Sequence, residues 1–258
     1  MDTCGYTWKY EPVKDMNMGF TEHLRKFPRE TGFMGSVIHG FFCLFLKIWF
    51  KVWNRLDITG IENLPESGSY VIVANHSSHL DAPALISMFP LGKLDRVYPA
   101  AAADYFFKGP VSSAFSAFCM NALPFERKEK TASTIAACRS LLFEKDNVLI
   151  IFPEGTRTTT GEINEFKAGI GLVLTGTKIP VVACRISGTF ERHPKGSRFP
   201  KSGSIRIDIG RPRIYVGLAP GKESAEIIAR DLRYEVTKLE AGPAAQRGLI
   251  PGMHISHM

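Results

Sequence analysis

The sequence has 258 residues, of which 45% are hydrophobic and 22% are charged. These proportions are ordinary for a folded globular protein and exclude a chain that is disordered throughout. The length suits one large domain, or one domain with an added terminal element. The net charge of +7 predicts an anionic partner, and a phospholipid surface, a phosphorylated substrate or nucleic acid would each fit it.

Cysteine spacing and the start of the sequence argue against a metal-binding or disulfide-rich protein and against a secretory signal. The five cysteines show neither the CxxC spacing of a metal site nor a disulfide framework. We therefore expect buried thiols in a reducing compartment and no metal ion. The first thirty residues carry charges throughout, so we expect no secretory signal there and irregular or weakly helical structure.

An aromatic, apolar segment follows. Its apolar stretch, 33–46, is shorter than the ~20 residues that span a bilayer. On a helix, Lys47, Lys51 and Arg55 would form a basic stripe beside a broad aromatic face. We expect residues 1–56 to form a segment whose helix lies at or dips into the cytoplasmic face of a membrane. The alternative is a helix that packs on its own domain.

The rest of the chain alternates between strands and helices. After a turn-rich connector at 57–68, short apolar runs predict strands at 70–74, 148–152, 179–186 and 204–209. Helical spacing predicts helices at 82–89, 131–145 and 223–240. This order predicts an α/β catalytic domain at 57–241, with a largely parallel central sheet flanked by helices. We expect a flexible tail at 242–258.

Two polar loops follow predicted strands. NHSSHLD begins after the strand at 70–74, and PEGTR begins after the strand at 148–152. Functional residues of such sheets gather at the carboxyl ends of the strands. These loops are therefore the first places to look for a site.

The first loop offers an imidazole and a carboxylate, His76 and Asp81, five residues apart. The pKa of an imidazole is near the working pH, so His76 can accept a proton from an alcohol. A carboxylate across the turn can hold the other ring nitrogen and stabilise the imidazolium. His79 competes for this role, but we expect it to be a structural or exposed imidazole, since only His76 has the downstream aspartate.

The second loop offers groups that bind phosphate. Gly155, Thr156 and Arg157 provide backbone amides, a hydroxyl and a guanidinium. Glu154 would need a partner there, and Arg157 or Arg127 could serve. The alternative is a solvated turn with a surface ion pair.

The two loops together resemble the first and third motifs of the phospholipid/glycerol acyltransferase family, which includes 1-acylglycerol-3-phosphate acyltransferases. Residues 123–127 are similar to the second motif, whose arginine falls on Arg127, although Asn121 and Ala122 stand where that motif usually begins with glycine. Residues 179–182 are similar to the fourth motif, and 166–169 resemble the segment that follows the third.

This resemblance implies transfer of a fatty acyl chain from acyl-CoA or acyl carrier protein, as co-substrate, to 1-acylglycerol-3-phosphate. The product would be phosphatidic acid in phospholipid biosynthesis, and no cofactor or metal would be needed. His76 would be the general base and Asp81 would orient it. The acceptor phosphate would be held by Arg127, Glu154, Gly155, Thr156, Arg157 and Lys167. Another lyso-lipid, such as lyso-ornithine lipid, or glycerol 3-phosphate would demand the same catalytic pair.

Other functions fit the sequence less well. The chain has no G-x-S-x-G, the nucleophile elbow of many serine hydrolases. In 171–178 no lysine directly follows the second glycine, as a P-loop requires, so we expect a packed helix there. The basic residues are spread out, so we expect no nucleic-acid partner. A basic lipid- or nucleic-acid-binding protein remains the non-enzyme alternative.

Overall fold

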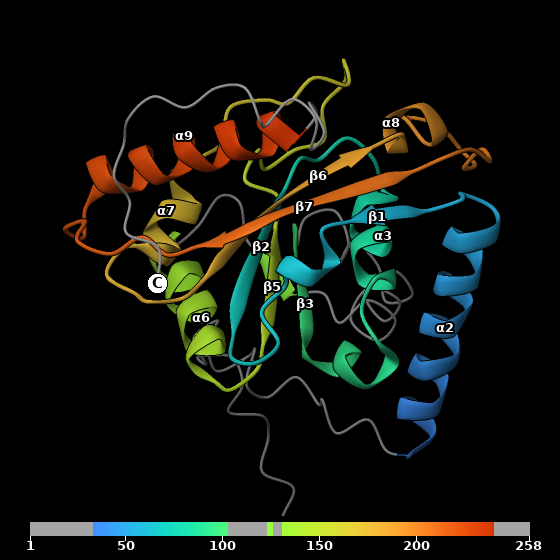
Figure 1. The fold of residues 1–258 in the computed structure, drawn as a ribbon, viewed down its shortest axis with the longest axis horizontal. Helices are drawn as coiled ribbons and strands as arrows, with labels where there is room; N and C mark the ends of the chain where they lie inside the picture. The colour runs from blue at the N-terminus through green and yellow to red at the C-terminus, as the bar shows by residue number, and fades with distance from the viewer. Residues whose placement is uncertain (1–32, 103–122, 126–130, 240–258) are drawn as a thin grey trace, which may run out of the picture.

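A seven-stranded sheet with the order β1-β7-β6-β2-β5-β3-β4 runs through the middle of the protein (Figure 1). The computed structural model describes residues 33–102, 123–125 and 131–239, so our expectations for 1–30, Arg127 and 242–258 lie outside the described residues. The strands are β1 (Asp57–Thr59), β2 (Tyr70–Ala74), β3 (Val97–Ala102), β4 (Leu123–Phe125), β5 (Val148–Ile151), β6 (Val181–Ser187) and β7 (Arg206–Arg213). Neighbouring strands are parallel except β6 and β7, which confirms a largely parallel sheet.

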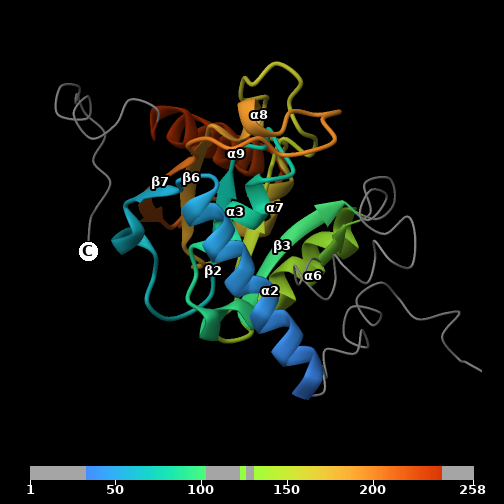
Figure 2. The ribbon, with the colours of Figure 1, turned by 90° about the vertical axis from the view of Figure 1, so that its right-hand side faces the viewer.

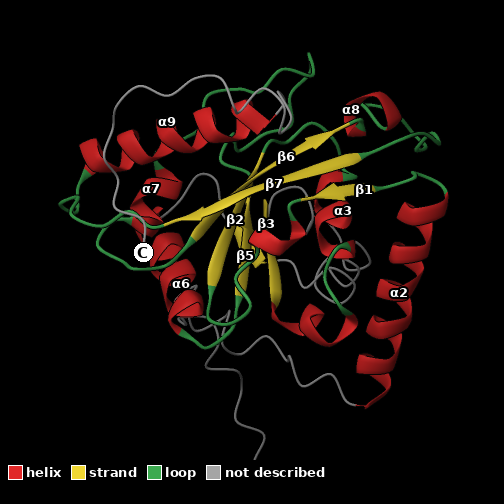
Figure 3. Ribbon diagram, in the orientation of Figure 1, coloured by secondary structure: helices red, strands yellow, loops and turns green. Residues whose placement is uncertain are grey.

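Helices cover both faces of this sheet. The helix α2 lies with α3 on one side, and α6, α7 and α9 lie on the other (Figures 1 and 3). Their bounds are α2 (Phe33–Val52), α3 (Asp81–Ser87), α6 (Thr131–Phe143), α7 (Gly169–Leu174), α8 (Thr189–Arg192) and α9 (Lys222–Lys238), with short 3-10 turns η2 (Ile61–Asn63) and η3 (Leu91–Arg96). The predicted α/β class is therefore confirmed.

The alternation of side chains along β2 divides the core into two layers. Tyr70, Ile72 and Ala74 pack toward α2 and α3, whereas Val71 and Val73 pack toward α6, α7 and α9. All five residues of β2 are buried. A strand covered on both faces needs apolar residues at every position, which explains the continuous apolar run in the sequence.

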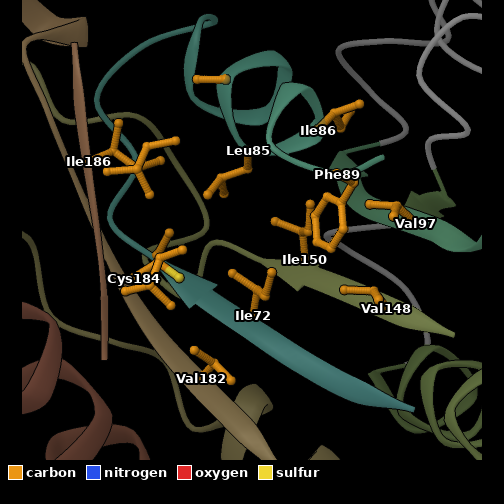
Figure 4. Close-up of a cluster of buried hydrophobic side chains, with 14 of the residues drawn as sticks. Ile72, Leu85, Ile86, Phe89, Val97, Val148, Ile150, Val182, Cys184 and Ile186 are labelled. Carbon is orange, nitrogen blue, oxygen red and sulfur yellow. The ribbon is translucent and has the colours of Figure 1, made fainter. Parts of the chain in front are cut away.

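The layer beneath α3 is closely packed. Figure 4 shows Leu85 and Phe89, from α3 and the turn after it, above Ile72 and Ile150 of the sheet. The cysteines whose side chains the structure describes are buried thiols, as expected: Cys43, Cys138 and Cys184.

Several elements differ from the sequence-based expectation. The predicted connector at 57–68 contains β1, which pairs with β7. It was missed because three residues, one exposed and two half-buried, carry no hydrophobic pattern. The strand β3 was missed because Pro99 and its alanines lack the β-branched residues typical of strands; β4 was missed because it has three residues. The segment 171–178 is helical only as far as Leu174, where α7 ends.

The helix α2 has two apolar faces. Cys43, Leu46 and Phe50 are buried in the core beside α3. The exposed apolar residues follow helical spacing along a second face: Phe41, Phe45, Ile48 and Val52. The predicted helix is thus confirmed and ends at Val52. Within the described ranges, no helix combines the length and apolar character needed to cross a bilayer.

The basic residues of α2 do not form the uniform stripe that we expected. The Lys47 ammonium donates a hydrogen bond to the carbonyl of Ser87, 2.8 Å away, at the C-terminal end of α3. A cation is favoured there by the helix dipole. Burial lowers the pKa of Lys47. Lys51 and Arg55 are exposed, so only these two remain available to the surroundings.

The packing of α7 on α9 can be tested at a glycine. An added Cβ at Gly171 would lie 2.1 Å from the carbonyl oxygen of Ala225, which is backbone and cannot move aside. We expect Gly171→Ala to lower the free energy of unfolding by about 1–3 kcal/mol, measured by denaturant titration. Gly169→Ala is the matched control, since nothing lies within 4 Å of its added Cβ. Equal stability of the two variants would contradict this packing.

Candidate active site

The two polar loops lie side by side because their strands are parallel neighbours. In the pairing of β2 with β5, Val73 is opposite Ile151, so both loops leave the same edge of the sheet. The backbone N–H of His76 donates to Oε1 of Glu154 at 2.6 Å. The N–H of Thr158 donates to the carbonyl of His76 at 2.9 Å. The two candidate loops are therefore joined by hydrogen bonds.

The first loop is also fixed to β6. The side chain of Asn75 donates to the carbonyl of Ile186 at 2.9 Å and accepts from its N–H at 2.8 Å. This pair of bonds extends the pairing of β2 with β6 by one position. The backbone of the loop is thus held at its start, immediately before His76.

His76 and Asp81 are in direct contact. Nδ1 of His76 lies 2.9 Å from Oδ2 of Asp81. The same oxygen accepts backbone N–H groups from Ser77 at 2.7 Å and Ser78 at 2.8 Å. Asp81 is completely buried and is the first residue of α3. N–H donors and the start of a helix both favour an ionised carboxylate, so Asp81 is built to carry a negative charge.

This contact sets the chemistry of the imidazole. An ionised carboxylate can only accept hydrogen bonds, so Nδ1 of His76 donates to it, and in the neutral ring Nε2 then keeps its lone pair. The ring stacks on Phe152, with 4.3 Å between ring centroids and 22° between planes. Its side chain is 21% exposed, while that of Asp81 is 0% exposed. The arrangement presents one basic nitrogen in a fixed direction.

Glu154 holds the two loops together. Its Oε2 accepts the backbone N–H of Asn164 at 3.1 Å and the side-chain amide at 2.9 Å, while Oε1 accepts from His76. Burial raises the pKa of Glu154, and these N–H groups oppose that shift. Among the expected arginine partners, Arg127 lies outside the described residues, and these hydrogen bonds to Glu154 come from N–H groups. Asn164 was missed because no sequence pattern marks its position.

Lys167 lies against the second loop. Its backbone N–H donates to the carbonyl of Pro153 at 3.0 Å. A Cβ added at Gly155 would be 2.7 Å from the Lys167 ammonium, and the φ of +73° at Gly155 also favours glycine. Thr156 is exposed and Arg157 is half-buried beside these residues. Arg157 and Thr156 of the loop and the adjacent Lys167 therefore supply two cations and a hydroxyl at the loop that is bonded to His76 through Glu154.

His79 is held in its neutral form. Burial, followed by the positive charge of Arg157 and the nearby His193 and His76, lowers the pKa of His79 to about 4. Its ring centroid is 6.0 Å from that of His193. This environment fits the structural imidazole that we expected, and the effect of Arg157 places that cation within electrostatic reach of the first loop.

Comparison with known proteins agrees with this geometry. A family model described as Acyltransferase matches residues 55–187, which include both loops. The chain belongs to the acyltransferase family. The chain is 31% identical over 173 residues to "1-acyl-sn-glycerol-3-phosphate acyltransferase BAT2, chloroplastic" of Brassica napus. The aligned region covers 64% of this chain and 48% of that protein. The chain is 26% identical to the human "1-acyl-sn-glycerol-3-phosphate acyltransferase alpha", over 69% of this chain and 61% of that protein.

The chain thus spans about half to three fifths of the length of these curated relatives. Its fold is shared with the crystal structure of "the 1-acyl-sn-glycerophosphate (LPA) acyltransferase, PlsC, from Thermotoga maritima". The TM-score is 0.61, with 22% sequence identity, and the match covers 86% of this chain and 88% of that one.

The neutral state of His79 predicts how the stability of the protein responds to acid. Its pKa is lowered from 6.5 to about 4 in the folded protein, so the unfolded chain binds a proton first. The stability that His79 contributes is therefore complete above pH 6.5 and is lost as the pH falls through 4. We expect His79→Gln to lose less stability than the wild type across this window, measured by denaturant titration. Parallel losses in the two proteins would contradict a neutral buried His79.

Proposed function

We propose that this protein transfers a fatty acyl chain from a thioester to the free hydroxyl of 1-acylglycerol-3-phosphate, which yields phosphatidic acid. The observation that carries the proposal is the 2.9 Å contact between Nδ1 of His76 and Asp81, which leaves Nε2 as a base. The names of the relatives support the acceptor. Acyl-CoA or acyl carrier protein supplies the thioester as a co-substrate.

The reaction proceeds in two steps at one imidazole. Nε2 of His76 takes the proton of the acceptor hydroxyl while that oxygen attacks the thioester carbonyl, which forms a C–O bond. The C–S bond then breaks, and the leaving thiolate receives the proton from the imidazolium. Asp81 stabilises the imidazolium between the two steps. The stabilisation is largest while His76 is positively charged, because the low local dielectric strengthens the attraction between the imidazolium and the buried carboxylate.

The second loop binds the acceptor phosphate in this proposal. Lys167 and Arg157 supply positive charge, Thr156 supplies a hydroxyl, and Gly155 keeps the backbone compact beside Lys167. Arg127 is expected to join them. Glu154 acts differently from our sequence-based expectation: a carboxylate would repel phosphate, and its hydrogen bonds suit it to positioning His76.

The base is tested by removing the imidazole. We expect His76→Ala to lower kcat by ~10²–10⁴-fold, measured as thiol release from acyl-CoA in the presence of 1-acylglycerol-3-phosphate. His79→Gln is the control, since it changes a nearby imidazole that is not the proposed base. Thiol release by His76→Ala at the wild-type rate, from a folded variant, would refute the proposed mechanism.

The membrane association of the enzyme is part of this proposal. The exposed face of α2 carries Phe41, Phe45, Ile48 and Val52, which are 69%, 54%, 55% and 71% exposed. An apolar face of this kind beside Lys51 and Arg55 is typical of helices that lie in a membrane interface. An interfacial α2 would bring the enzyme to the bilayer that contains its lipid acceptor and product. We place this surface on the cytoplasmic side of the membrane.

The α2 proposal is tested with two matched phenylalanines. Phe41 on α2 and Phe143 on α6 are 69% and 71% exposed and lie on opposite faces of the sheet. We expect Phe41→Ser to weaken binding to phosphatidylcholine vesicles by about tenfold, since burial of one such side chain is worth roughly 1.5–3 kcal/mol. Phe143→Ser should bind as the wild type does in a flotation assay. Equal binding by both variants would exclude α2 as the contact.

A further inference from the structure

A compact loop follows α8 and is held closed by its own contacts. We call residues 192–203 the basic loop. The N–H of Lys201 donates to the carbonyl of Arg192 at 2.8 Å, and the N–H of Ser197 donates to the carbonyl of Pro194 at 3.0 Å. The Arg192 side chain packs against Gly203, where an added Cβ would lie 2.2 Å from Nε. These contacts give the tip of the loop a defined shape.

The tip displays positive charge and one large apolar side chain. Lys195, Arg198 and Lys201 are exposed, and Phe199 is 75% exposed. The sequence of the basic loop contains no aspartate or glutamate. An exposed phenylalanine between basic residues is the composition expected of a surface that meets an anionic apolar boundary.

The base of the loop is tied to the end of α2. The N–H of Gly203 donates to the carbonyl of Trp53 at 3.3 Å, and the N–H of Ile205 donates to the carbonyl of Asn54 at 3.0 Å. Figures 1 and 2 show the chain after α8 beside the C-terminal end of α2. The basic loop therefore continues the region where Lys51 and Arg55 are exposed.

The other end of the loop is tied to the catalytic loop. The hydroxyl of Ser78 donates to the carbonyl of His193 at 2.8 Å. The hydroxyl of Ser77 lies 3.0 Å from that of Thr189 in α8. Both serines also donate backbone N–H groups to Asp81. A surface bound by the basic loop would thus lie close to the site that holds His76.

We propose that the basic loop binds the headgroups of anionic phospholipids, with Phe199 inserted among the lipids. This inference rests on the membrane association proposed above and adds to it a second contact with a different chemistry. The face of α2 would supply apolar attachment to any bilayer. The basic loop would supply the preference for negative lipids and would fix the side of the enzyme that faces the bilayer.

The two contacts can be separated by vesicle composition. We compare flotation with vesicles of phosphatidylcholine alone and with vesicles that also contain phosphatidylglycerol, using the full-length protein. Each basic residue near an anionic surface contributes about fivefold to binding, so Lys195→Ala/Arg198→Ala should weaken binding to the mixed vesicles by roughly 25-fold. Its binding to phosphatidylcholine should stay at the wild-type level. High salt should reduce the difference between the two vesicle types.

The control is Lys222→Ala/Arg230→Ala, which removes the same charge from exposed positions on α9, away from α2 (Figure 1). Equal losses in the two double variants would overturn the proposal, because net charge alone would then explain binding. Wild-type binding of the loop variant to mixed vesicles would also overturn it. If Phe41→Ser binds phosphatidylcholine as the wild type does, only the proposed contact of α2 is contradicted. If His76→Ala remains active, only the proposed mechanism is contradicted.

A water-soluble short-chain acceptor gives the last comparison. Thiol release with this acceptor does not require a membrane, so the loop variant should match the wild type within about twofold. A large loss of this activity would show that the loop supports the catalytic site itself, and the headgroup contact would then be wrong.

Discussion

The site depends on a buried carboxylate that is charged where water cannot reach it. Asp81 is 0% exposed. Its Oδ2 accepts hydrogen bonds from Nδ1 of His76 and from two backbone N–H groups. Its other oxygen, Oδ1, is buried without a hydrogen-bond partner among the described residues. A buried charge is costly unless donors surround it, so the loop must fold tightly around Oδ2. The position of the imidazole follows from the same requirement.

The sheet makes this tight turn possible. Because β2 lies between β5 and β6, the loop that follows it can be tied to both neighbours. Glu154, after β5, accepts the N–H of His76, and Asn75 bonds to Ile186 of β6. The basic loop is held to the same turn through Ser78. The proposed membrane contact and the proposed base are therefore connected through a few hydrogen bonds of one turn.

The sequence predicted those features that short-range patterns determine. The strands β2 and β5 were found because buried parallel strands need continuous apolar runs, and the polar loops at their carboxyl ends marked the place of the site. The closeness of His76 and Asp81 followed from their spacing across a turn. The strands β1 and β4 were missed because three residues carry no pattern, and their pairing depends on distant parts of the chain.

Contacts between distant residues explain the other differences. Lys47 was expected on an open basic stripe, but its ammonium donates to the carbonyl of Ser87 at the end of α3. Nothing in the sequence of 33–55 predicts that α3 ends beside Lys47. Asn164, ten residues downstream in an irregular segment, donates to Glu154, and no sequence pattern pointed to this contact. The sequence did not single out the basic loop, because its position beside the end of α2 depends on contacts between distant residues. Tertiary packing decides each of these cases.

The tautomer of His76 tests the central claim most directly. If the buried Asp81 carboxylate holds Nδ1–H, the ¹⁵N NMR spectrum of the imidazole at neutral pH should show a protonated Nδ1 and an unprotonated Nε2. Comparison with Asp81→Asn should show that this preference is lost, because an amide can offer a donor in place of the carboxylate. A protonated Nε2 in the neutral wild-type ring would contradict the account, since no lone pair would then face the acceptor hydroxyl.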